Sequence, residues 1–182
     1  MITLDILREV SDGSVKDSVL NELIDSFNTY LPKYKIDTPL RYCAFLSQCS
    51  HETGGFQFFH ELGSKKYFSK YEPGTKIGNV LGNINPGDGY KYRGRGIFML
   101  TGRSNYQRYS KVILKDLIGD PDQAASIPCA VLIACEFWDR KKLSPLADAK
   151  KISAITRMIN GGYNGLEERK RLYNKLIRNL NS

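Results

Sequence analysis

The chain has 182 residues and a formal net charge of +8, and 41% of its residues are hydrophobic while 25% are charged. This balance is typical of one soluble globular domain with a buried core, and no run of about 18 apolar residues could form a membrane-spanning helix. The first ten residues include Asp5 and Glu9 and lack the basic start and apolar core of a signal peptide. We therefore expect a protein that is made and folded in the cytoplasm.

Helical periodicity predicts three helices in the first third of the chain, which cover residues 3–11, 15–31 and 38–53. The third begins at Thr38-Pro39, which supplies a capping hydroxyl and a proline suited to the first helical turn. Gly54 and Gly55 then end it, because glycine is favoured just past a helix C-terminus.

Residues 62–100 differ from the rest, because eight glycines and two prolines interrupt any long element. We expect an irregular central region here, with a short hairpin around Tyr90–Met99. Aromatic side chains in this stretch argue against disorder, because they offer surface for packing or for stacking on sugars; they are Tyr67, Phe68, Tyr71, Tyr90 and Tyr92.

Helices are expected again at 104–117, 127–142, 148–159 and 164–179, with a short one that starts at Asp120-Pro121. The last helix carries Asn164 and Glu167 at the spacing of a capping box. The predicted fold class is therefore mainly α. We expect a single domain over residues 1–182, with two lobes around a substrate cleft and no separate wall-binding domain.

Two carboxylates stand out after the helix that ends near Thr53. Glu52 lies in its last turn, where the helix dipole and burial against Phe56 and Phe59 favour the protonated acid. Glu61 follows in a loop beside lysines 65 and 66, which favour its ionised form. Two carboxyls with such different surroundings indicate a general acid and a general base acting on a glycosidic bond.

Other interpretations of this segment remain open. The spacing alone also fits two ordinary surface glutamates. His51, Glu52, His60 and Glu61 could cluster around a metal, but their spacing is not that of a helical His-Glu-x-x-His site. We therefore expect no metal and no cofactor.

A second segment, residues 92–106, reads YRGRGIFMLTGRSNY. Its glycines permit close backbone approach, and Arg93 and Arg95 supply cations. Thr101 and Asn105 offer neutral hydrogen-bonding groups suited to sugar hydroxyls and N-acetyl groups. The glycines match neither nucleotide-binding pattern, because they lack the required strand-to-helix spacing and the lysine.

The four cysteines, Cys43, Cys49, Cys129 and Cys135, fall in apolar helical patterns, so we expect buried free thiols. The charge is concentrated near the C-terminus, where residues 141–182 carry ten Lys or Arg and three Asp or Glu, a net charge of +7. A basic face attracts polyanions such as nucleic acid, anionic membranes or wall polymers, and charge alone does not separate them.

Three segments in this order resemble glycoside hydrolase family 19, and within it the single-domain, lysozyme-like endolysins of bacteriophages. They are FLSQCSHETGGF at 45–56, YRGRGIFMLTGRSNY at 92–106 and INGGYNGLEER at 159–169. The resemblance implies a lysozyme-like helical domain. Met99 departs from the family pattern, which commonly has Gln there, and the segment after Glu61 also differs.

The resemblance implies roles for individual residues. Glu52 takes the catalytic acid position, Glu61 the general base position, and Thr101 the position of a hydroxyl that holds the attacking water. Substrate-binding positions are implied or expected at His51, Tyr92, Arg95, Asn105, Asn160 and Arg169. The family inverts the anomeric carbon, which requires carboxyls roughly 6.5–9.5 Å apart.

The expected function is that of an endolysin, a lysozyme-type enzyme that hydrolyses β-1,4 bonds of peptidoglycan. The alternatives are a chitinase and a non-catalytic polyanion-binding protein. The expected partner is the anionic wall polymer, with no nucleic acid and no membrane anchor, and the protein is expected to be a monomer. It would stay in the host cytoplasm until a holin releases it to the wall, where the basic last helix could bind.

Overall fold

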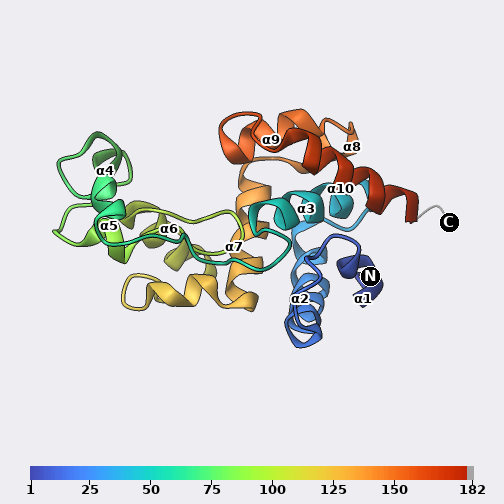
Figure 1. Ribbon diagram of the computed structural model, residues 1–182, viewed down its shortest axis with the longest axis horizontal. Coiled ribbons are helices and arrows are strands. Elements are labelled where there is room, and N and C mark those ends of the chain that lie inside the picture. Colours follow the sequence, from blue (N-terminus) through green and yellow to red (C-terminus); the bar gives the residue numbers. More distant parts are fainter. Residues whose placement is uncertain (180–182) are drawn as a thin grey trace. The chain divides into compact units, whose positions relative to one another are not determined.

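The computed structural model describes residues 1–179, which divide into two compact units. Unit 1 combines Met1–Phe58 with the chain from Ala134 onward, and unit 2 is Phe59–Ile133. No helix within the described residues is both long and apolar enough to span a membrane. The prediction of a mainly helical chain is confirmed (Figure 1).

Unit 1 contains most of the longer helices: α1 (Leu4–Arg8), α2 (Asp17–Tyr30), α3 (Pro39–Glu52), α8 (Ser144–Asp148), α9 (Ile152–Asn160) and α10 (Leu166–Asn179), with the 3-10 turn η1 (Pro32–Tyr34). Helix α7 (Ile127–Arg140) starts in unit 2 and ends in unit 1. Unit 2 contains η2 (Tyr67–Tyr71), α4 (Lys76–Val80), α5 (Asp88–Lys91), α6 (Arg103–Ile113) and η3 (Pro121–Ala125).

Helix α3 lies at the centre of unit 1, where every residue from 43 to 50 is buried. The ring of Phe45 meets those of Phe27 and Trp138 edge-on, with centroids 6.1 and 5.2 Å apart. Helix α10 packs along α3 (Figure 1). This burial on all sides of α3 between residues 43 and 50 fixes the position of the helix end.

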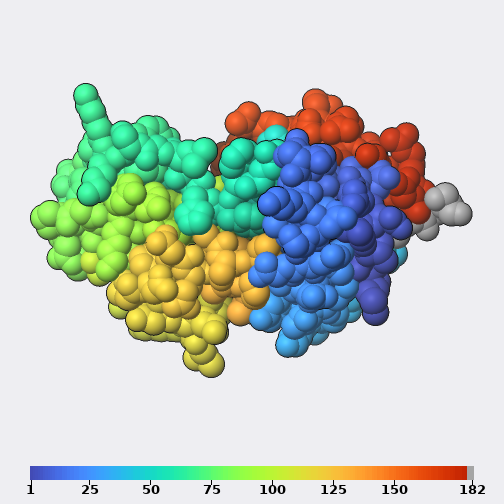
Figure 2. Space-filling model, turned by 60° about the horizontal axis from the view of Figure 1, so that its bottom comes forward, coloured from blue at the N-terminus to red at the C-terminus, as the bar shows by residue number. Residues whose placement is uncertain are grey.

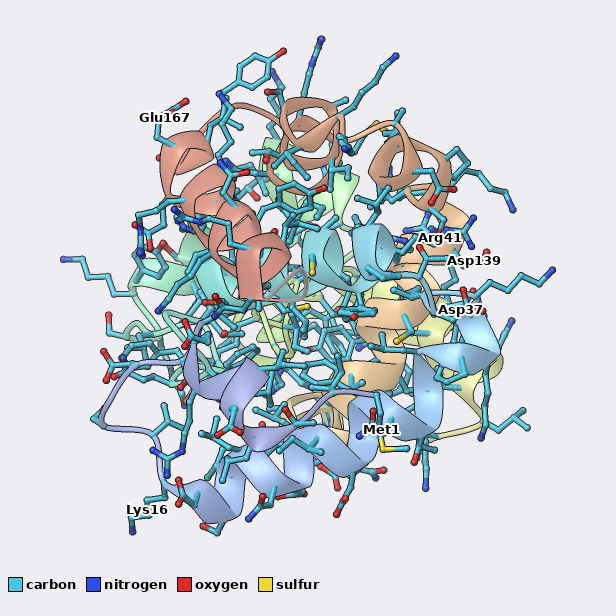
Figure 3. All side chains as sticks on the ribbon, turned by 90° about the vertical axis from the view of Figure 1, so that its right-hand side faces the viewer. Met1, Lys16, Asp37, Arg41, Asp139 and Glu167 are labelled. Carbon is cyan, nitrogen blue, oxygen red and sulfur yellow. The ribbon has the colours of Figure 1, made fainter. Side chains whose placement is uncertain are left out.

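The start of α3 is anchored as well. Thr38 Oγ1 accepts a hydrogen bond from the backbone N–H of Arg41, so the predicted cap is confirmed. The Arg41 guanidinium lies 3.7 Å from Asp37 (Figure 3). It also lies 2.7 Å from Asp148 of α8. At the other end of unit 1, Lys175 of α10 pairs with Glu9 at 2.8 Å, where the N-terminal segment adjoins the C-terminal helix (Figure 2).

Unit 2 is held by a buried ion pair. Both Asp88 carboxylate oxygens accept hydrogen bonds from Arg103 at 2.7 Å, and the backbone N–H groups of Ile84 and Asn85 donate to Oδ2. Burial alone would raise the pKa of Asp88, but these donors outweigh it and lower the pKa to about 2. The pair joins α5 to the start of α6.

Three local predictions are wrong. The expected hairpin at 90–99 is the end of α5 followed by a tight reversal, closed by an isolated β-bridge between Arg95 and Leu100. The helix predicted over 148–159 ends as expected but starts later, as α9 at Ile152, and Asp148 belongs to a separate short helix, α8. Asn164 does not form the expected capping box, because its side chain makes no hydrogen bond within residues 1–179 and α10 begins only at Leu166. Its backbone carbonyl instead accepts a hydrogen bond from Arg169.

Candidate active site

Glu52 is the last residue of α3 in unit 1. The helix ends there because Gly54 and Gly55 follow with φ angles of 59° and 73°, which glycine adopts without a steric penalty. Arg169 Nη2 donates a hydrogen bond to Glu52 Oε1 at 2.5 Å, and the Glu52 side chain is 19% exposed. Glu52 Oε2 makes no hydrogen bond to any of residues 1–179.

Arg169 projects from α10 and is buried, with 2% of its side chain exposed. Its Nη1 donates to Gln48 Oε1 at 2.7 Å, and its Nε donates to the Asn164 carbonyl at 3.3 Å. The guanidinium is therefore fixed by three partners and positions the Glu52 carboxyl.

His51 and Asn160 also lie in unit 1. A Cβ built on Gly165 would clash with the His51 ring, so only glycine fits beside it, at a φ of 68°. Burial, followed by the charge of Arg169, lowers the pKa of His51, so the imidazole is neutral near pH 7. Asn160 is exposed at the end of α9, and its amide makes a long hydrogen bond of 3.5 Å to the Asn164 carbonyl.

Glu61 lies in unit 2, and both of its carboxylate oxygens accept hydrogen bonds. Tyr71 donates its hydroxyl to Oε1 at 3.0 Å, and the backbone N–H of Gly94 donates to Oε2 at 3.0 Å. Lys70 Nζ lies 3.9 Å from Oε1, and the Glu61 side chain is 21% exposed. The prediction that lysines 65 and 66 supply the cation beside Glu61 is wrong. Lys70 supplies it instead, and Lys65 Nζ lies over the Tyr90 ring, 5.6 Å from its centroid.

Gly94 packs closely against Glu61. A Cβ on Gly94 would lie 3.0 Å from Glu61 Oε2 and 3.1 Å from Glu61 Cβ. The two residues also pair through their backbones, since the N–H of Glu61 donates to the Gly94 carbonyl at 2.8 Å. The loop that carries Glu61 is therefore tied to the glycine-rich segment that the sequence singled out.

Thr101 and Asn105 follow in the same segment. The Thr101 hydroxyl donates to the Met99 carbonyl at 2.8 Å, and the Met99 side chain lies beside Gly94. Asn105 donates its amide to the Thr101 carbonyl at 2.8 Å. Both side chains are partly exposed, so they can reach a ligand. Their assigned roles stay predictions.

Tyr92 and Arg95 require a correction, because both are buried within unit 2. Arg95 donates from Nε to Asp122 at 2.7 Å and from Nη1 to the Lys91 carbonyl at 2.8 Å. Tyr92 packs against the ring of Tyr106, 5.2 Å away between centroids. Both side chains are buried and make their contacts inside this unit, so neither is exposed to contact a sugar.

Three supporting residues were not predicted: Gln48, which accepts a hydrogen bond from Arg169, and Lys70 and Tyr71, which lie beside Glu61 Oε1. Gln48 stands four residues before Glu52 on the same helix, so its spacing already placed both side chains on one face. Tyr71 and Lys70 carry no comparable signal, because η2 is too short to show a helical period.

Within residues 1–179, no three His, Cys, Asp or Glu side chains come together as a metal site. His51 and Glu52 belong to unit 1, whereas His60 and Glu61 belong to unit 2. His60 Nε2 lies 3.9 Å from Asp122. The four cysteines are buried and free, as predicted.

The comparisons with known proteins agree with the family that the sequence segments resemble. A family model for glycosyl hydrolase family 19, chitinase class I, matches residues 24–156. A Haemophilus influenzae protein with a glycosyl hydrolase family 19 domain is 30% identical over 94% of this chain and 96% of its own length. An endochitinase of Arabidopsis thaliana is 34% identical over 65% of this chain, which spans 38% of that protein.

Among solved structures, chitinase C from Streptomyces griseus HUT6037 superimposes with a TM-score of 0.75 over 100% of this chain and 93% of its own. The two sequences are 17% identical, so this likeness concerns the fold. The family match covers most of the chain, and the Haemophilus relative aligns over nearly its whole length. The chain therefore belongs to glycosyl hydrolase family 19 and is a chitinase-like glycoside hydrolase.

Proposed function

We propose that this enzyme hydrolyses the β-1,4 bond between N-acetylmuramic acid and N-acetylglucosamine in peptidoglycan, with inversion at the anomeric carbon. Glu52 donates its proton to the glycosidic oxygen as the bond to the anomeric carbon breaks. Glu61 takes a proton from a water held by Thr101, and that water attacks the opposite face. Both products leave with complete hydroxyl groups, and the exchange of protons with solvent restores the two carboxyls.

The contrast between the two carboxyls supports this division of roles. Glu61 receives donors on both oxygens, an arrangement suited to a carboxylate because an ionised carboxyl only accepts hydrogen bonds. Glu52 is bonded through Oε1, which leaves Oε2 to carry a proton. This difference in donors is the observation that carries the assignment of acid and base.

The net charge of +8 supports peptidoglycan as the substrate. Peptidoglycan carries lactyl-peptide groups with carboxylates, whereas chitin is neutral, so a basic enzyme is attracted to the former. On this ground we also propose the endolysin role, in which cleavage of the wall lyses the cell.

A chitinase is the second candidate, and the names of the relatives favour it. The Arabidopsis relative is an endochitinase and the Streptomyces structure is a chitinase. Both polymers contain β-1,4-linked N-acetyl sugars, so the residues around Glu52 and Glu61 suit either substrate.

Mass spectrometry of soluble products separates the two. Purified peptidoglycan and chitin oligomers are incubated in parallel with the parent protein and with Glu52→Gln. We expect disaccharide-peptides with a reducing N-acetylmuramic acid from the parent alone. Cleavage of chitin but not of peptidoglycan would establish the chitinase, and cleavage of neither polymer would refute both assignments.

A further inference from the structure

A groove of about 1010 Å³ lies in unit 1, bordered by α8, α9 and α10 and by the turn after α9. None of the predicted site residues lines it. Its volume is at the upper end of the range for small-molecule sites, roughly 300–1,000 Å³, so it can hold several linked groups rather than one ion.

The groove is lined by cations and by no acid. Lys150, Lys151 and Arg157 line it and are exposed, and none of them pairs with an Asp or Glu within residues 1–179. Lys170, the fourth cation, is paired with Glu167 at 2.9 Å. Glu167 is 85% exposed and points away from the protein at the start of α10 (Figure 3).

A second cavity in unit 1 differs from the groove in its balance of cations and acids. This cavity, of about 510 Å³, is lined by three cations and three acids. Two of its cations are paired, Arg171 with Glu168 at 2.9 Å and Lys175 with Glu9 at 2.8 Å. Its charges are therefore balanced, whereas those of the groove are not.

The same ion pairs bear on the hypothesis that the basic last helix binds the wall, which stays a prediction. Four of its five cations are neutralised by acids, Arg169 by Glu52 and the others by Glu167, Glu168 and Glu9. The fifth, Arg178, pairs with no Asp or Glu within residues 1–179, and the same holds for the groove cations that lie just before α9 and on it.

Apolar side chains border the groove beside these cations. Tyr163 is 57% exposed and Met158 is 42% exposed, although large apolar groups are usually covered. Leu146 and Tyr173 also line the groove. A ligand that carries both negative charge and small apolar groups satisfies the two halves of this lining, whereas a neutral sugar leaves the cations unpaired.

We propose that this groove binds the stem peptides of peptidoglycan. These short peptides combine free carboxylates with alanine methyl groups, which complement the three lysine and arginine side chains and the Met158 and Tyr163 side chains. The inference rests on the proposed function, because the peptides occur beside the glycan only in peptidoglycan. The groove would hold the polymer by its peptides while the glycan is cut elsewhere.

Titration calorimetry with a stem tripeptide of alanine, γ-linked D-glutamate and diaminopimelate tests the proposal. The test variant is Lys150→Gln/Lys151→Gln/Arg157→Gln. Its matched control, Lys16→Gln/Lys33→Gln/Lys111→Gln, removes the same charge from exposed sites outside the groove. We expect the test variant to weaken binding about tenfold or more and the control to change it less than about twofold, because screened charges act only nearby.

The parent protein should bind the tripeptide less tightly as the salt concentration rises. It should not bind a form of the tripeptide in which every carboxyl group is a methyl ester. No binding by the parent, or equal binding by the test variant, would overturn the proposal. Groove-dependent binding to phosphatidylglycerol vesicles without peptide binding would also overturn it. Peptidoglycan cleavage is measured separately, so cleavage without peptide binding refutes only the groove, and peptide binding without cleavage refutes only the proposed function.

Discussion

Unit 1 and unit 2 each hold one acidic side chain of the predicted site, but with different kinds of partner. Glu52 in unit 1 is bound by one buried cation, Arg169, which lies 117 residues later in the chain. Glu61 in unit 2 accepts hydrogen bonds from a neutral hydroxyl and a backbone N–H, from positions 10 and 33 residues away, and the nearby cation Lys70 is partly exposed and 3.9 Å from Oε1. Two glutamates nine residues apart therefore occupy surroundings that differ in charge and in burial of the partner.

The difference shows how identical side chains acquire distinct chemistry. A buried guanidinium on one oxygen orients the Glu52 carboxyl and leaves the other oxygen for a proton. Neutral donors bond to both oxygens of Glu61, with the Lys70 ammonium 3.9 Å from Oε1, and each oxygen keeps a lone pair for a proton from water. The predictions below test this comparison, beginning with the largest expected effect.

Replacement of Glu52 by Gln should lower turnover by about 10²–10⁴-fold, because general acid catalysis contributes about this much. The same change at Glu61 should abolish hydrolysis but leave sugar binding near that of the parent. Initial rates and calorimetric binding of a non-cleaved oligomer measure the two effects. Circular dichroism melts serve as the control for folding, and lysis by Glu52→Gln at the parental rate would refute the mechanism.

Replacement of Arg169 by Met should lower the free energy of unfolding by about 3 kcal/mol, because it leaves the carboxylate of Glu52 without its buried partner. Tyr71→Phe removes one neutral donor from Glu61 and should cost about 1–2 kcal/mol. Urea denaturation of both variants measures the difference. Equal costs would contradict the distinction between a charged and a neutral support.

Replacement of Gly94 by Ala should shift the Glu61 carboxyl by a few tenths of an ångström, since the new Cβ would lie 3.0 Å from Oε2. We expect turnover to fall about tenfold, because misplaced catalytic groups are costly, with little change in melting temperature. Gly13→Ala is the control, since nothing lies within 4 Å of a Cβ there. Parental activity in Gly94→Ala would show that Glu61 does not depend on this contact.

Acid should weaken unit 2 through Asp88, whose pKa is lowered from 3.8 to about 2. A carboxyl whose pKa is lower in the folded state than in the unfolded state stabilises the fold at pH values above its unfolded-state pKa. This contribution is lost as the pH falls through the folded-state pKa. Stability from the Asp88–Arg103 pair should therefore hold above about pH 4 and decline toward pH 2. Hydrogen exchange of the α5 and α6 backbone amides measures this loss of stability. The Asp88→Asn variant should lack the decline between about pH 4 and pH 2 that the Asp88–Arg103 pair causes.

The sequence predicted the helix that carries Glu52 well, because strong local signals mark both of its ends. Thr38-Pro39 and Gly54-Gly55 bound α3 within one residue of the expected limits. It also predicted the helix that ends at Asn160, since Gly161 follows with a φ of 75°. The short helices of residues 62–100 were missed, because elements of four or five residues show no helical period.

The partners of the acids lay beyond prediction from spacing, because they depend on contacts between distant segments. Nothing local indicates that Arg169 reaches Glu52 or that Tyr71 reaches Glu61. Arg95 shows the converse, since an arginine beside glycines resembled an exposed binding group but pairs with Asp122, 27 residues later. A sequence pattern gives residue type and order, whereas burial follows from tertiary packing.

The pH dependence of kcat/KM, measured on the polymer that the parent cleaves, tests the division of roles most directly. The parent should give a bell-shaped profile, which falls in acid as Glu61 takes a proton and in base as Glu52 loses one. The residual activity of Glu52→Gln should lose the alkaline limb and keep the acid limb, whereas Glu61→Gln should show no measurable hydrolysis at any pH. Loss of the acid limb in Glu52→Gln, or an unchanged profile in that variant, would contradict the assignment.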